Sequence, residues 1–175
     1  IPQARQRLTA APLESLFNIS ATHWSEREDN SDTWNGLRLF SIDGTTLRCA
    51  DTKETAEHFG YIRGWTGGHG EYPMVRLCAL MSLRSRLIRD VKFGPSHTGE
   101  ISYAKQLIKS APAHSLTILD RCYLSAELML NWQRNNEQQH WMTPVKSNTK
   151  YTILESYADN DFLVEMNVSP HAKKQ

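Results

Sequence analysis

The sequence has few cysteines, and they form no paired motif. Its 175 residues include three cysteines, Cys49, Cys78 and Cys122, which lie far apart without a C-x-x-C pair. An odd number of separated cysteines argues against a disulfide framework and against a zinc cluster. A reducing compartment such as the cytoplasm is therefore expected.

Long apolar runs and a charge excess are also absent. The sequence has no run of about 18 apolar residues and no charged-then-apolar leader, so neither a membrane span nor a secretory signal is predicted. We therefore expect a soluble protein. Lys and Arg number 20 against 19 Asp and Glu, a formal net charge of +1. Any affinity for nucleic acid must then come from local basic patches.

The two ends of the sequence look like cuts through a longer protein. The sequence starts at Ile1 rather than at Met, and it ends in the polar stretch SPHAKKQ, 169–175. Its length suffices for one domain with a core of its own. We expect one compact unit with attachments, and functional groups that lie outside the sequence.

Hydrophobic periodicity predicts a mixture of strands and helices. Strands are predicted where apolar and polar residues alternate or apolar runs are short: 37–43, 75–83, 87–93, 115–120 and 139–145. Helices are predicted where apolar residues recur at helical spacing: after Pro12, over 99–112 and over 123–136. Glycines predict a surface loop over 51–72.

The order of these elements predicts an α/β fold. The connection between 75–83 and 87–93 is short, so these strands are expected to be antiparallel neighbours. The segment 150–168 is expected to form a hairpin that turns at ADND, 158–161. Strands followed by α/β alternation predict a central mixed sheet flanked by helices.

Two of the predicted strands end on an aspartate, at Asp43 in LFSID and at Asp120 in LTILD. Ligands gather outside the carboxyl ends of strands in open α/β sheets, so these carboxylates converge if their strands are neighbours. Adjacent carboxylates repel each other unless a divalent cation lies between them. Oxygen ligands without Cys or His favour Mg²⁺ or Mn²⁺, and a pair of such ions supports phosphoryl transfer.

Each aspartate also has an ordinary structural interpretation. Asp43 begins an Asp-Gly dipeptide, one of the commonest turn sequences. Asp120 could cap the helix that follows it. Composition and periodicity leave both interpretations open beside the metal site.

An ordered set of motifs resembles the catalytic region of IS4-family transposases. The motifs are GLRLFSIDGTTLRCADT, YPMVRLCALMSL, FGPSHTGE, ILDRCYLSAEL and WMTPVKSNTKYTILE, and the resemblance extends from Ile1 to Gln175. It implies an RNase H-like fold with a DDE metal triad. It also implies a cut-and-paste DNA transposase that uses Mg²⁺, with Mn²⁺ as a substitute, to cleave transposon ends and transfer the strand.

The resemblance implies roles for the two aspartates by their position in these motifs. Asp43 is similar to the first metal-binding aspartate of the family and Asp120 to the second. The third ligand, a glutamate in a Y-x-x-R-x-x-x-E-x-x-x-x-x-x-K motif, has no counterpart in the sequence and is expected beyond Gln175. Three internal glutamates are not expected to replace it: Glu127, Glu155 and Glu165.

The resemblance also implies how the chain is divided. Residues 1–36 would be a lead-in from a preceding N-terminal region, 37–147 a partial RNase H-like catalytic core, and 148–175 the start of a β-strand insertion. The implied partners are double-stranded DNA, at transposon ends and target, and a second copy in a homodimer. The implied location is the bacterial cytoplasm, at the nucleoid when DNA is bound, without a membrane.

Basic residues near the two aspartates are candidates for DNA contact, because phosphate contacts supply most non-specific affinity. The candidates are Arg48, Arg121, Lys146 and Lys150. The alternative for each is a solvated surface charge.

Two rival functions follow from the same motifs. Without the third carboxylate, the chain could be a truncated, catalytically inactive DNA-binding remnant of a transposase. A generic RNase H-like nuclease, which hydrolyses DNA without joining it, would use the same metal geometry.

Overall fold

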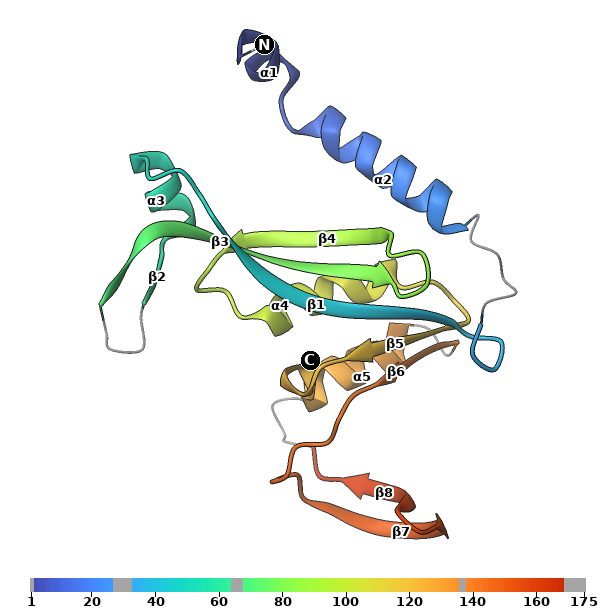
Figure 1. Ribbon diagram of the computed structural model, residues 1–175. Helices are drawn as coiled ribbons and strands as arrows, with labels where there is room; N and C mark the ends of the chain where they lie inside the picture. Colours follow the sequence, from blue (N-terminus) through green and yellow to red (C-terminus); the bar gives the residue numbers. More distant parts are fainter. Residues whose placement is uncertain (1, 27–32, 64–67, 136–137, 169–175) are drawn as a thin grey trace.

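Two helices precede the central sheet of the protein. The computed structural model describes residues 2–26, 33–63, 68–135 and 138–168 (Figure 1). Helix α1 (Pro2–Leu8) is followed by α2 (Ala11–Glu26), which confirms the helix predicted near Pro12 and extends it to 16 residues. Within these described residues, no helix is long and apolar enough to cross a membrane.

A six-stranded mixed sheet forms the centre of the structure. Its strands are β1 (Arg38–Arg48), β2 (Tyr61–Arg63), β3 (His69–Ser82), β4 (Ile88–Pro95), β5 (Ser115–Leu119) and β6 (Gln139–Met142). The strand order is β2-β3-β1-β5-β6, with β4 paired to β3. Strand β3 is antiparallel to β1 and β4, whereas β1, β5 and β6 are parallel. The predicted α/β class with a mixed sheet is confirmed, as is the antiparallel pair β3 and β4.

Helices α4 (Glu100–Leu107) and α5 (Ala126–Asn135) pack on one face of this sheet and confirm two predicted helices. Their apolar stripes meet the sheet in a core where several side chains have no exposed surface: Phe40, Leu80, Leu107, Leu128 and Trp132. Two 3₁₀ helices, η1 (Ile108–Ser110) and η2 (Arg121–Tyr123), connect these elements. Burial of this apolar surface is the main stabilising contribution to the fold.

The second face of the sheet is covered less completely. Arg89 of β4 donates a hydrogen bond to Oγ of Ser25 in α2 at 2.7 Å, which holds this helix on the second face (Figure 1). Elsewhere on this face, large apolar side chains stay in contact with solvent: Leu47 is 51% exposed, Phe93 62% and Met142 50%. The strands therefore bury one face deeply and leave much of the other accessible.

Strand β1 does not end at Asp43, so the prediction of a strand boundary there is wrong. The strand continues to Arg48, because β3 pairs with it from Asp43 opposite Ala79 to Arg48 opposite Met74. The interpretation of Asp43 and Gly44 as a turn is wrong for the same reason. Pairing with a partner distant in sequence overrides the local turn preference of Asp-Gly.

The surface loop predicted over 51–72 is also wrong for most of its length. Helix α3 (Lys53–Phe59) forms there, and its N-terminus is a capping box in which Thr52 and Thr55 bond each other's backbone N–H. Gly60, with φ of 71°, ends this helix before β2. The glycine-rich positions 64–67 lie outside the described residues.

The predicted hairpin is confirmed, and it extends away from the sheet at the bottom of Figure 1. Strands β7 (Tyr151–Ala158) and β8 (Asp161–Met166) pair antiparallel. The turn includes Asn160, whose φ of 63° is in the left-handed region that asparagine tolerates. Nearly all its side chains are exposed, so the hairpin contributes little to the core.

Replacing Leu128 by Ala should destabilise the protein by about 2 to 5 kcal/mol, because the side chain is fully buried and its loss leaves a cavity. The matched control is Leu16→Ala in α2, where the side chain is 64% exposed and the expected change is below about 0.5 kcal/mol. Urea unfolding followed by circular dichroism measures both. Equal destabilisation of the two variants would contradict the assignment of the core.

Candidate metal centre

Asp43 and Asp120 occupy equivalent positions on neighbouring strands. The parallel pairing of β1 with β5 ends where Ile42 lies opposite Leu119. The next residue on β1 is Asp43, and the next residue after β5 is Asp120. The two strands are therefore neighbours, which is the condition for the two carboxylates to converge.

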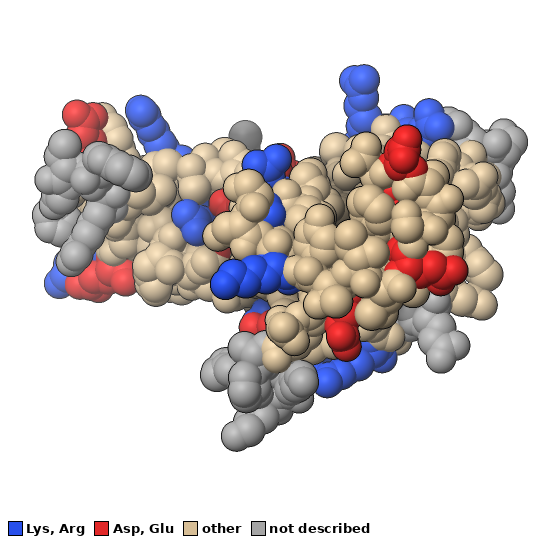
Figure 2. Space-filling model, turned by 90° about the horizontal axis from the view of Figure 1, so that it is seen from below, with Lys and Arg blue, Asp and Glu red and all other residues tan. Residues whose placement is uncertain are grey.

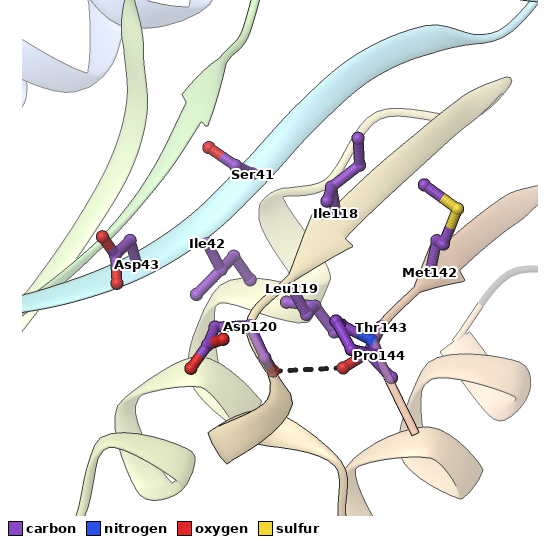
Figure 3. A pocket seen from close by; sticks show the side chains of 9 residues that line it. All are labelled: Ser41, Ile42, Asp43, Ile118, Leu119, Asp120, Met142, Thr143 and Pro144. Atoms are coloured by element: carbon purple, nitrogen blue, oxygen red, sulfur yellow. Dashed lines mark hydrogen bonds between the residues drawn. The ribbon is translucent and has the colours of Figure 1, made fainter. Parts of the chain in front are cut away.

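Both aspartates line one hollow, of about 670 Å³, on the second face of the sheet. Side chains alternate along a strand, so Asp43 shares a face with Ser41, and Asp120 with Ile118. Figure 3 shows both carboxylates at one end of this hollow, beyond the point where β1 and β5 stop pairing. Both residues are exposed.

The backbone after Asp120 orients its carboxylate. Oδ2 accepts a hydrogen bond from the backbone N–H of Cys122 at 3.3 Å, which makes Asp120 the N-cap of η2. The backbone N–H groups of Arg121 and Cys122 favour the charged form and lower the pKa of Asp120 below its ordinary value. The carbonyl of Asp120 accepts from the Thr143 hydroxyl at 3.1 Å (Figure 3). The capping interpretation is thus correct, although the helix that Asp120 caps is a 3₁₀ turn.

Asp43 is held by the strand that carries it. Its Oδ1 accepts a hydrogen bond from the backbone N–H of the next residue, Gly44, at 2.8 Å. The second carboxylate oxygen, Oδ2, makes no hydrogen bond to a described residue. Both aspartates thus use a carboxylate oxygen in a local backbone contact.

A third carboxylate, that of Glu100, lies close to the two aspartates. Desolvation and hydrogen bonding with Asp120 are the two largest causes that raise the pKa of the Cys122 thiol to about 11. The negative charges of Asp120, Glu100 and Asp43 act on this thiol in the same direction. Three separated segments thus concentrate negative charge around one short turn.

Sequence reasoning did not identify Glu100 as part of this region. Two signals were available: Glu100 closes the FGPSHTGE motif, and Gly44 interrupts a strand pattern directly after Asp43. A glycine inside a strand often marks the close approach of another group. The turn interpretation of Asp-Gly concealed this alternative.

The donor set of the hollow fits a hard divalent cation. Two exposed carboxylates face it, and Mg²⁺ is commonly bound by one or two carboxylates together with water and substrate phosphates. In the part of the chain that the structure describes, no three His, Cys, Asp or Glu side chains are arranged to hold a metal ion. Two carboxylates are therefore the acidic groups that the described residues bring to this hollow, fewer than a complete set of protein ligands.

Arg121 and Lys146 lie together beside the aspartates. They line a second hollow that shares Asp120 with the first. Lys146 donates through Nζ to the carbonyl of Leu124 at 3.1 Å, which fixes its ammonium group near η2. Two of the four basic residues predicted to contact DNA thus lie at the edge of the candidate site.

Arg48 and Lys150 line neither hollow. Arg48 lies at the end of β1, where its guanidinium is 5.3 Å from the centre of the Tyr72 ring. Lys150 is exposed and directly precedes β7. Figure 2 shows Lys and Arg dispersed among uncharged residues on the face it displays, rather than gathered in one patch.

The three internal glutamates also lie elsewhere. Glu127 of α5 pairs with Lys105 of α4. Glu155 and Glu165 lie on the exposed hairpin, in β7 and β8. None of the three is among the residues that line the two hollows.

Two curated relatives resemble this chain over most of its length. The putative transposase InsZ of Escherichia coli (strain K12) is 33% identical over 155 residues, which cover 89% of this chain and 52% of that protein. The transposase InsG for insertion sequence element IS4, of the same organism, is 32% identical over 173 residues, 99% of this chain and 39% of that protein. The chain thus spans about half or less of the length of these relatives.

A solved structure and a family model also match. The cryo-EM structure of a piggyBac transposase synaptic complex with hairpin DNA superposes with a TM-score of 0.43 and 17% identity, over 65% of this chain and 24% of that one. The family model of the transposase DDE domain matches residues 34–175. The chain therefore belongs to the transposase DDE domain family, among its IS4-family members.

Proposed function

We propose that this chain is part of the catalytic core of a cut-and-paste DNA transposase in which Asp43 and Asp120 hold Mg²⁺, with Mn²⁺ as a substitute. The observation that carries the proposal is the equivalent position of two exposed carboxylates where the pairing of β1 and β5 ends. The proposed reaction is cleavage of a phosphodiester at a transposon end, followed by attack of the freed 3′-hydroxyl on a second phosphodiester.

The roles of the residues follow from their contacts. When bound, Mg²⁺ stabilises the attacking and leaving oxygens of an in-line phosphoryl transfer. Asp120 presents a carboxylate that backbone N–H groups keep ionised and oriented. Arg121 and Lys146, beside Asp120, hold the DNA phosphate. Arg48 and Lys150 belong to this proposal as outlying phosphate contacts.

The proposal extends to the organisation and partners of the protein. Residues 1–36, 37–147 and 148–175 would be the lead-in, the partial catalytic core and the start of the insertion. The substrates are double-stranded DNA at the transposon end and at the target, and the active form is a homodimer in the cytoplasm. A glutamate outside this sequence completes the ligand set.

A second candidate function is binding of DNA without catalysis. It is favoured by one observation: no third carboxylate joins Asp43 and Asp120 in a metal-binding arrangement among the described residues. A third candidate, a nuclease without strand transfer, shares the site geometry. A strand-transfer assay with a labelled transposon end distinguishes all three. A transposase joins the cleaved end to target DNA, a nuclease cleaves the end without joining it, and a DNA-binding protein without catalysis leaves it intact.

Replacing either aspartate by Asn should lower the affinity for Mn²⁺ at least about tenfold, because a neutral amide replaces a charged oxygen ligand. Isothermal titration calorimetry of the 175-residue chain and of its Asp43→Asn and Asp120→Asn variants measures this. The control is Asp159→Asn, in the exposed turn of the hairpin, which should bind as the parent does. Equal affinity in all four proteins would refute the metal site.

Arg121→Gln and Lys146→Gln should each weaken binding to duplex DNA by about the same factor for any sequence, since each removes one phosphate contact. Each should also reduce by about 1 the steepness with which the logarithm of the binding constant falls with the logarithm of the salt concentration. Fluorescence anisotropy at several salt concentrations measures both quantities. Lys53→Gln is the control, because Lys53 is an exposed residue of α3 that pairs with Glu57. If Lys53→Gln weakens binding as strongly, the proposed DNA contact surface is wrong.

A further inference from the structure

Glu100 approaches β1 so closely that a side chain at position 44 would displace its carboxylate. A Cβ atom placed on Gly44 would lie 2.8 Å from Cδ of Glu100 and 3.0 Å from its Oε2. Gly44 is in the interior of β1 and has no positive φ, so its backbone conformation does not require glycine. The close approach of Glu100 therefore favours a glycine directly after Asp43.

The same carboxylate contacts the turn that carries the second aspartate. Oε2 of Glu100 accepts a hydrogen bond from the hydroxyl of Tyr123 at 3.4 Å. Tyr123 is fully buried and is the last residue of η2, the turn that Asp120 caps. Glu100 thus connects the strand of Asp43 with the turn of Asp120.

Arg76 of β3 completes this arrangement. Its Nε lies 4.0 Å from Oε1 of Glu100, and its Nη1 donates to the carbonyl of Thr98 at 3.2 Å. The buried Nε makes no hydrogen bond to a described residue, and the negative charge of Glu100 at 4.0 Å partly balances its positive charge. Through these contacts, Arg76 of β3 holds the carboxylate of Glu100 next to Gly44.

An acidic residue in the first turn of a helix is favourable by itself, because it interacts with the helix dipole. That interaction alone would not require a glycine at position 44 or a contact with Tyr123. Two contacts of Glu100, with Gly44 and with Tyr123, are instead with the two segments that carry Asp43 and Asp120, and the third is with Arg76 of β3. Glu100 reaches them from the core face of the sheet and does not line the hollow itself.

We propose that Glu100 is a positioning residue of the metal site, a role that rests on the proposed function. Its carboxylate holds β1 and η2 at a fixed separation, and its negative charge adds to the attraction that the two aspartates exert on a cation. Gly44 is the complementary element, because the absence of a Cβ atom leaves room for this carboxylate where it now lies.

The affinity for Mn²⁺ of the 175-residue chain tests this role, measured by calorimetry without DNA. Glu100→Gln keeps the size of the side chain and removes its charge, and it should weaken Mn²⁺ binding about three- to tenfold. Gly44→Ala should weaken binding similarly by displacing Glu100. In a Glu100→Ala background, Gly44→Ala should cause no further loss, because the added methyl group then has space.

The control is Glu127→Gln, which removes a carboxylate of similar exposure that pairs with Lys105 away from the hollow. It should bind Mn²⁺ as the parent does. Circular dichroism and the urea midpoint without metal identify any variant that has lost its fold, and the coupling between Gly44 and Glu100 is then read from the remaining variants.

Two results would overturn the inference, and they differ in what else they affect. If Glu100→Gln binds Mn²⁺ as tightly as the parent while Asp43→Asn does not bind, Glu100 has no positioning role and the proposed function stands. If the parent chain itself binds no Mn²⁺, the metal site and the role of Glu100 are both wrong. A loss in Glu127→Gln equal to that in Glu100→Gln would also refute a specific role.

Discussion

The parallel pairing of β1 with β5 is the constraint on which the rest of the site depends. Phe40 and Ile42 are buried on the core face, and this burial fixes the register in which Ile42 lies opposite Leu119. A slip of one residue would turn every side chain of a strand to the other face. The core of the protein therefore determines that Asp43 and Asp120 face the same side.

Local sequence patterns were sufficient to predict most of the elements on this sheet. The short apolar run before Asp120, the helical spacing of Leu124, Leu128 and Trp132, and the hairpin turn at ADND each describe a structure that neighbouring residues determine. The same patterns, together with the ordered motifs, indicated that the two aspartates belong to one region. The fold class and the pair of aspartates were therefore accessible from the sequence.

The remaining features depend on contacts between residues far apart in sequence. Asp-Gly has a strong local preference for a turn, and only the pairing of β1 with β3 reveals that Asp43 lies within a strand. The helix α3 begins at a capping box of two threonines, a signal weaker than the glycines that follow it. The contact between Gly44 and Glu100 joins two elements whose proximity no local pattern encodes.

The two sides of the site are built from backbone of different kinds. Asp43 lies within β1, which is hydrogen-bonded to β3 for several residues beyond it, whereas Asp120 lies where β5 gives way to a single 3₁₀ turn. Backbone pairing with β3 holds the Asp43 wall, whereas the Asp120 wall is held by the buried side chain of Tyr123 and its hydrogen bond to Glu100. Amide exchange at the first wall would therefore report opening of the sheet, and amide exchange at the second would report loss of the side-chain contacts of η2.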